Sequence, residues 1–230
     1  MTYTESDTPF PIIEVDPGFA QGMGELRAKR KYWFHRDDGD ASWLFKADER
    51  LAGAQAGETQ GVGGVGEDWS EKIASEICVL LDIPHVRYEM AVEKGTGIPG
   101  VICQNIVAGR QILVLGNQLM LERDPAYPSD NELKYGVREH TVDAVLETLA
   151  SLQRPPDAFC ENLPESIQTA EDVFLGYTML DALIANQDRH HQNWAAIREG
   201  GRKFFCSSDG SVRPRFSRHG SRIEGFICGM

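Results

Sequence analysis

The apolar residues of this 230-residue chain recur with two different periods, and the change between them limits the folds that it can adopt. In the first half, residues 86–92 alternate between apolar and other side chains, and residues 101–107 form a short apolar run, as is typical of β-strands. In the second half, apolar residues recur every three or four positions over 142–152 and 173–184, as is typical of amphipathic helices. The sequence therefore predicts an α+β fold with two lobes, a small mixed lobe followed by a mainly helical one.

Two further elements are predicted in the smaller lobe. Aromatic-rich runs at 31–34 and 42–46 flank the turn-forming segment 37–40, which predicts a β-hairpin. After a glycine-rich stretch at 52–66, which we expect to be a flexible loop, helical periodicity predicts a helix of about twelve residues that begins after Asp68 and cannot continue past Pro84. A hairpin, a helix and two strands make a compact α+β unit.

The chain can be divided by composition into four parts. Residues 1–20 are polar and contain several prolines, so we expect a loosely held arm. The smaller lobe is predicted over 21–116 and the helical lobe over 117–205. Residues 206–230 are rich in Ser, Arg and Gly with little apolar periodicity, so they are predicted to form an atypical, disordered tail.

The overall composition disfavours several classes of function. A net charge of −12 opposes direct binding to nucleic acid, because the phosphate backbone attracts basic surfaces. No apolar run is long enough to span a bilayer, and the N-terminus lacks the basic and apolar regions of a secretory signal. Five scattered cysteines without a CxxC pair are typical of reduced thiols. We therefore expect a cytoplasmic protein.

The segment that carries chemistry lies between the second amphipathic helix and a short strand predicted at 194–197. It places Asp188 and Asn193 five positions apart on a polar loop. In kinases this separation allows an aspartate to accept the proton of a substrate hydroxyl while an asparagine oxygen binds a metal ion. An isolated pair of this kind is more often an ordinary polar turn, so the surrounding residues have to decide between the two interpretations.

Those surrounding residues resemble the HipA-like protein kinases. Residues 183–194, LIANQDRHHQNW, are similar to that family's catalytic loop, in which a helix ends in hydrophobic-x-N-x-D-[RA]-H-x-x-N. Residues 66–74, GEDWSEKIA, are similar to the G-E-x-W-x-E-K-[IVL]-A stretch of its stand-alone members. The resemblance implies a protein-kinase-like fold, with magnesium-dependent transfer of the ATP γ-phosphate to a Ser or Thr hydroxyl of an unidentified protein substrate.

The resemblance also implies roles for individual residues. Asp188 would be the catalytic base and Asn193 a ligand of Mg²⁺, while Asp181 and His190 would brace the loop that carries them. Lys46, at the end of the predicted strand 42–46, would contact the α- and β-phosphates.

The resemblance gives Lys46 an ion-pair partner, Glu71. Helical periodicity alone places Glu71 and Glu76 at similar angles from the apolar face of their helix. A glutamate at capping-box spacing also needs no role in a site. The periodicity leaves both residues open, and only the family motif favours Glu71.

A phosphate-binding loop is expected ahead of the lysine strand, over 21–31. Gly22 and Gly24 could let backbone N–H groups approach phosphate oxygens. The segment is neither a Walker loop nor a complete G-x-G-x-x-G, and the entry to a hairpin can itself require glycine. The basic residues within it are more often a solvated surface than a nucleic-acid contact.

The chain departs from the family pattern after Phe205. A second metal-binding aspartate would lie in a segment like L-A-P-x-[FY]-D, and Asp209 is close to the expected place without those flanking residues. We therefore expect a lobe that is incomplete at the C-terminus, from a truncation or a frameshift, with a divergent surface tail as the alternative. The alternative function is a pseudokinase, or a nucleotide-binding interaction module without turnover.

Two more distant hypotheses come from the same residues. Asp188, His190 and His191 could be read as a metal-dependent hydrolase site, but neighbouring histidines on an extended segment point to opposite sides. Longer toxin members of the HipA-like family bind a DNA-binding antitoxin partner. The sequence gives no separate support for an antitoxin partner here.

Overall fold

The computed structural model describes residues 10–23, 30–36, 41–48, 67–107, 109–128, 135–155 and 163–206. The chain divides into two compact units. The first unit comprises Met1–Ser75 and Arg87–Ile106, and the second comprises Glu76–Val86 and Val107–Met230. Both strands and helices are present, which confirms the predicted mixed α+β class.

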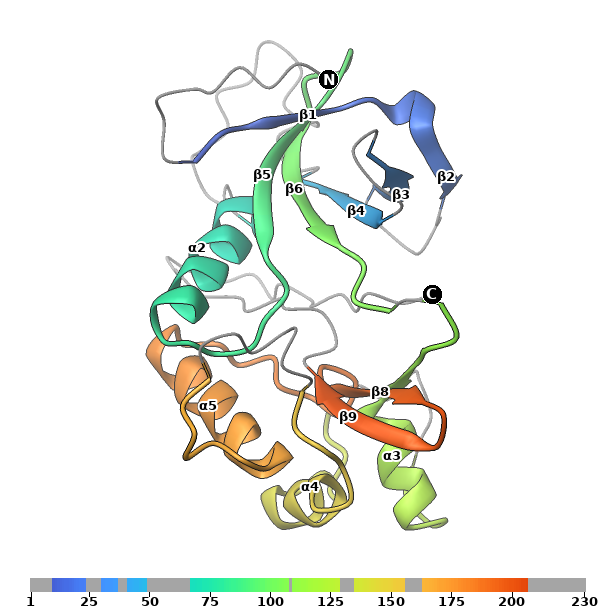
Figure 1. The fold of residues 1–230 in the computed structure, drawn as a ribbon, viewed down its shortest axis with the longest axis vertical. Coiled ribbons are helices and arrows are strands. Elements are labelled where there is room, and N and C mark those ends of the chain that lie inside the picture. The colour runs from blue at the N-terminus through green and yellow to red at the C-terminus, as the bar shows by residue number, and fades with distance from the viewer. Residues whose placement is uncertain are drawn as a thin grey trace. The chain divides into compact units, whose positions relative to one another are not determined.

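The first unit is built on a six-stranded sheet (Figure 1). Its strands, in spatial order, are β1 (Ile13–Val15), β5 (Tyr88–Glu93), β6 (Pro99–Gln104), β4 (Ser42–Ala47), β3 (Lys31–His35) and β2 (Ala20–Met23). Strand β1 runs parallel to β5, and the other neighbouring pairs are antiparallel. Helix α2 (Glu67–Leu80) follows β4 in the chain and begins in this unit.

The predicted elements of this unit are confirmed with small shifts of their ends. Strands β3 and β4 pair in continuous register from Lys31 opposite Lys46 to His35 opposite Ser42. Alternation along β3 buries Tyr32 and Phe34, as a half-buried strand requires. The core of the sheet consists of Val15, Tyr32, Phe34, Phe45, Ala47, Ala91 and Ile102.

The N-terminal segment differs from the prediction. Residues 13–20, which we expected in a loosely held arm, form strand β1, a 3-10 helix at Pro17–Phe19 and the start of β2. Val15 is almost completely buried, because β1 adds a strand to the sheet beside β5. Over residues 13–20 the prediction was wrong, because a strand of three residues is too short to produce a periodic signal. Residues 1–9 of the predicted arm lie outside the described residues.

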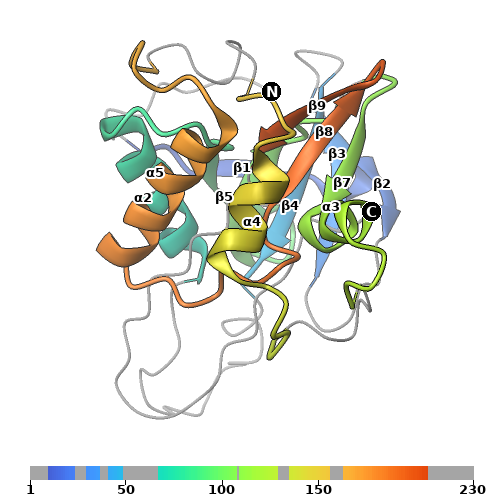
Figure 2. The same cartoon turned by 90° about the horizontal axis from the view of Figure 1, so that it is seen from below.

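The second unit combines a small antiparallel sheet with helices (Figure 2). The sheet contains β7 (Ile112–Leu115), β8 (Ala195–Glu199) and β9 (Arg202–Cys206). The helices are α3 (Gly116–Arg123), α4 (Val142–Leu149) and α5 (Ala170–Leu183), and α4 lies between α3 and α5. Trp194 and Phe205 are buried in the core that these elements share.

The boundary between the units also differs from the prediction. We expected the smaller lobe to reach residue 116, whereas the first unit ends at Ile106. The reason is that β7 pairs with β8, so it belongs to the same unit as the loop that precedes β8. The predicted loop at 52–66 and the tail after Cys206 lie outside the described residues. Within the described ranges, no helix is long and apolar enough to cross a membrane.

Candidate active site

Helix α5 ends in a way that fixes the start of the loop after it. Ala185 has a φ of 55°, and the N–H of Asn186 donates to the carbonyl of Asp181 at 2.8 Å. This is the Schellman arrangement, in which glycine is the usual residue at the left-handed position. An alanine there is strained, and such strain persists only where the surrounding contacts fix the backbone.

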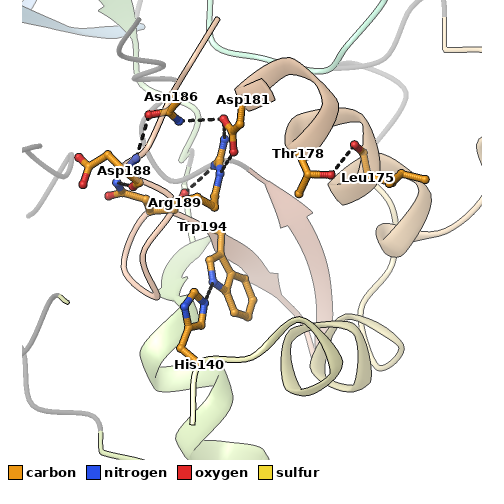
Figure 3. Close-up of polar contacts among 9 residues, drawn as sticks. His140, Leu175, Thr178, Asp181, Asn186, Asp188, Arg189 and Trp194 are labelled. Atoms are coloured by element: carbon orange, nitrogen blue, oxygen red, sulfur yellow. Dashed lines mark hydrogen bonds and ion pairs between the residues drawn. The ribbon is translucent and has the colours of Figure 1, made fainter. Parts of the chain in front are cut away.

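Asp181 supplies those contacts (Figure 3). Its carboxylate accepts from Nε and Nη2 of Arg189 at 2.8 and 2.9 Å, and from Nδ2 of Asn186 at 2.8 Å. The side chains of Asp181 and Arg189 are only 10% and 15% exposed, so this two-pronged ion pair is largely removed from water. These are the contacts of a residue that braces the loop, and Arg189 as its partner was not predicted.

Asp188 stands at the centre of the braced loop. Its N–H donates to Oδ1 of Asn186 at 3.1 Å, and its carbonyl accepts from the N–H of His190 at 3.0 Å. The carboxylate accepts a hydrogen bond from the hydroxyl of Tyr135, and its Oδ1 lies 3.9 Å from Nε2 of His190. The side chain is 13% exposed, so it can meet a substrate group while its backbone stays fixed.

Asn193 is held against the same backbone. Its Nδ2 donates to the carbonyl of Asp188, and its own carbonyl accepts from Nη1 of Arg189 at 3.0 Å. Asn193 is buried, at 4% exposure, and its Oδ1 has no hydrogen-bond partner among the described residues. A buried acceptor without a donor is costly unless a ligand satisfies it.

Amide and carboxylate oxygens are the ligands that Mg²⁺ accepts in proteins, so this loop fits a magnesium ion. Asn193 would offer Oδ1, which its own Nδ2 contact keeps turned away from the Asp188 carbonyl. The described ranges contain no group of three His, Cys, Asp or Glu side chains that could hold a metal by themselves. The further ligand that the sequence suggests, Asp209, lies outside those ranges.

The two histidines of the loop have different partners. Nδ1 of His190 accepts from the N–H of Gln192 at 3.1 Å, which leaves its proton on Nε2, facing Asp188. His191 is fully buried and forms a hydrogen bond with the hydroxyl of Tyr127 at 2.9 Å. The two imidazole rings therefore bond to different groups and do not converge on one metal position. This gives no support to a metal-dependent hydrolase site.

Trp194 connects the end of the loop to His140 and to Gly116. Nε1 of Trp194 donates to Nε2 of His140 at 3.3 Å, and the N–H of Gly116 donates to the Trp194 carbonyl at 2.7 Å. Burial, with a smaller contribution from His191, lowers the pKa of His140 to about 4. His140 is therefore neutral at neutral pH, and its Nε2 is able to accept from Trp194.

The close packing of Trp194 and His191 requires glycine at position 116. A Cβ atom there would lie 2.3 Å from Cε2 of Trp194 and 2.5 Å from the carbonyl oxygen of His191. We predict that Gly116→Ala lowers the free energy of unfolding by about 1–3 kcal/mol, because it overpacks the base of the loop.

The matched control for Gly116→Ala is Gly176→Ala on α5, where the nearest atom to an added Cβ lies 4.0 Å away. Alanine is preferred over glycine inside a helix, so this variant is expected to gain up to about 1 kcal/mol. Urea denaturation of both variants checks the pair. Equal effects of the two substitutions would contradict the packing explanation.

The first unit positions Lys46. Its Nζ donates to the hydroxyl of Tyr88 at 2.9 Å and lies 3.4 Å from Oε1 of Glu71, with both members of the ion pair largely buried. Of the two glutamates that periodicity leaves open, Glu71 is thus the one found on Lys46. Tyr88, which is buried at the start of β5, was not predicted as a contact. That Lys46 shares a pocket with Asp188 and Asn193 stays a prediction.

The strand that carries Lys46 is closely packed by β6. A Cβ atom at Gly100 would lie 2.2 Å from the carbonyl oxygen of Lys46, so only glycine permits this approach. The predicted phosphate-binding loop is different: Gly22 lies within strand β2, where the register with β3 shifts between Gln21 and Met23. Gly22 is therefore explained by a β-bulge. Gly24 lies outside the described residues.

Comparisons with known proteins show a similarity at the level of the fold. Neither family models nor curated proteins give a match. Nine chains among solved structures match, including the crystal structure of a Helicobacter pylori proinflammatory kinase, CtkA. That match has a TM-score of 0.53 and 18% identity, and it covers 88% of this chain. This chain spans 62% of the length of the neighbour. The likeness shows a kinase-like fold.

Proposed function

We propose that this chain is a HipA-like protein kinase that uses Mg²⁺ and transfers the γ-phosphate of ATP to a Ser or Thr hydroxyl of another protein. The observation that carries this proposal is the loop between α5 and β8. It holds the partly exposed carboxylate of Asp188 and the unpartnered Oδ1 of Asn193 on one braced backbone, in a chain with a kinase-like fold. An ordinary polar turn would satisfy its buried amide oxygen instead of leaving it open.

The chemistry assigns a separate task to each side chain. Asp188 would accept the proton of the acceptor hydroxyl as its oxygen attacks the γ-phosphorus, while the bond to the β–γ bridging oxygen breaks and ADP leaves. Asn193 and Asp209 would hold Mg²⁺, which neutralises phosphate charge when bound. Braced by Asp181 and Arg189, the loop fixes both groups before substrate arrives.

Lys46 supports the proposal independently, because it is held in the manner that a phosphate-binding lysine requires. It projects from a strand rather than a loop, and Glu71 and Tyr88 both contact its ammonium group. A cation on a rigid strand is positioned more precisely than one on a loop. Lys46 would contact the α- and β-phosphates of ATP.

The test is incubation of the purified full chain with γ-labelled ATP, Mg²⁺ and dephosphorylated casein. We expect label in protein that is lost when EDTA removes the metal and when Lys46 is replaced by Ala. Lys94→Ala is the matched control. Lys94 is an exposed lysine of the same unit, and its Nζ lies 3.3 Å from Oδ2 of Asp16.

Two outcomes would decide against the proposal. Absence of label from every protein, together with no thermal stabilisation by ATP and Mg²⁺, would overturn it. Stabilisation by ATP without any label would instead select a nucleotide-binding module without turnover.

A further inference from the structure

The position of Tyr135 is unusual for an exposed tyrosine. Its side chain is 53% exposed, yet its hydroxyl donates to Oδ1 of Asp188 instead of being directed only to solvent. Its ring also meets the ring of His190 edge-on, with centroids 5.2 Å apart and an interplanar angle of 82°. The Tyr135 hydroxyl is thus hydrogen-bonded to the Asp188 carboxylate, to which we assign the role of base.

The imidazole under Tyr135 is itself fixed. His190 is buried, and its Nδ1 accepts from the N–H of Gln192, so the ring cannot turn freely. Edge-to-face contact with an immobile ring gives a tyrosine a preferred orientation. The Tyr135 hydroxyl is therefore directed to Asp188 by two contacts, a hydrogen bond and a ring contact.

In the proposed reaction, the acceptor is a hydroxyl that donates to Asp188 and then gives up its proton to it. The Tyr135 hydroxyl already makes that hydrogen bond. A group inside the chain that occupies the acceptor position has a large advantage over one that must arrive by diffusion. The geometry therefore places a phosphorylatable group of this chain where the substrate would be.

We propose that Tyr135 is an intramolecular phosphate acceptor, an inference that rests on the proposed kinase function. The phenol proton passes to Asp188, and the phenol oxygen forms a bond to the γ-phosphorus of ATP. The bond between that phosphorus and the bridging oxygen breaks, ADP leaves with the electron pair, and Asp188 returns the proton to water. The product carries a doubly ionisable phosphate beside Asp188, and repulsion between the two ends the contact.

The first test examines the contact without ATP. The full chain is prepared with 3-fluorotyrosine, and the fluorine resonance that disappears in Tyr135→Phe is assigned to Tyr135. We expect Asp188→Asn to shift this resonance, whereas Asp143→Asn, an exposed position on α4, leaves it unchanged. An identical resonance in the wild type and Asp188→Asn would show that the hydroxyl is not on Asp188 and would overturn the inference.

The second test follows the phosphate. Phosphatase-treated full chain is incubated with Mg²⁺ and ATP, and the modified residues are mapped by mass spectrometry. We expect phosphate on Tyr135, approaching one per chain, with a rate constant that does not change on dilution. Tyr135→Phe should lose this phosphate and still label added casein.

The two ways of failing are distinct. Labelling of casein without phosphate on Tyr135 would overturn this inference and leave the proposed function standing. An observed rate constant that falls in proportion to dilution would show transfer between molecules and would also overturn it. Absence of transfer to every acceptor would overturn the proposed function, and this inference with it.

Discussion

Replacing Asp188 by Asn is expected to lower the rate of phosphoryl transfer by about 10²–10⁴-fold, the range typical for loss of a general base. The substitution keeps the size of the side chain and an oxygen that can accept from Tyr135, but it removes the carboxylate that we propose as the proton acceptor. The N–H of residue 188 donates to Asn186 and its carbonyl accepts from Asn193, and both bonds are retained because they involve main-chain atoms of residue 188. Folding and ATP binding should therefore be unchanged.

The measurement is transfer of labelled phosphate to casein at saturating ATP, accompanied by thermal denaturation with and without ATP. Asp143→Asn makes the same chemical change at an exposed position of α4 and serves as the control. Transfer by Asp188→Asn at the wild-type rate would remove Asp188 from the reaction. A loss of stability as large as that of Gly116→Ala would show that the residue acts through the fold.

Much of the fold could be predicted because it follows from local periodicity. The helical spacing of Val173, Phe174, Tyr177 and Leu180 marks the buried face of α5, and all four are buried. The contacts within the loop between α5 and β8 were also accessible from the sequence, because Asp181, Asp188 and Asn193 lie within one short segment. Their mutual contacts depend on the end of α5 and the turn after it, both of which are local features.

The parts that escaped prediction depend on partners distant in the chain. Tyr135 reaches Asp188 across 53 positions, and Lys46 reaches Tyr88 across 42, with no pattern that connects them. The short apolar run of strand β7 does not by itself indicate which unit it joins, because that depends on its pairing with β8. A tyrosine in a polar segment has no local feature that separates a site residue from an ordinary surface residue.

The ion pair of Asp181 and Arg189 is expected to be the main source of stability of the loop between α5 and β8. Asp181→Ala should lower the free energy of unfolding by about 3–5 kcal/mol, because it leaves the Arg189 charge largely buried without its carboxylate. Asn186 loses an acceptor at the same time. The exposed cluster of Glu122 with Arg198 and Lys203 is the control, and Glu122→Ala should cost no more than about 1 kcal/mol.

A double-mutant cycle separates the ion pair from its surroundings. The loss of stability in Asp181→Ala is expected to come from a buried Arg189 guanidinium that lacks its carboxylate. If so, the double variant Asp181→Ala with Arg189→Ala should lose clearly less free energy of unfolding than the sum of the two single variants. Urea denaturation of all four proteins measures the coupling. Phosphate transfer measured in parallel should fall in the two variants that lack the Asp181 carboxylate, because the Asn186 side chain then loses the acceptor that holds it beside the strained turn. Additive penalties would show that Asp181 and Arg189 act separately. In that case the rigid presentation of Asp188 and Asn193 would need another cause than the ion pair of Asp181 and Arg189.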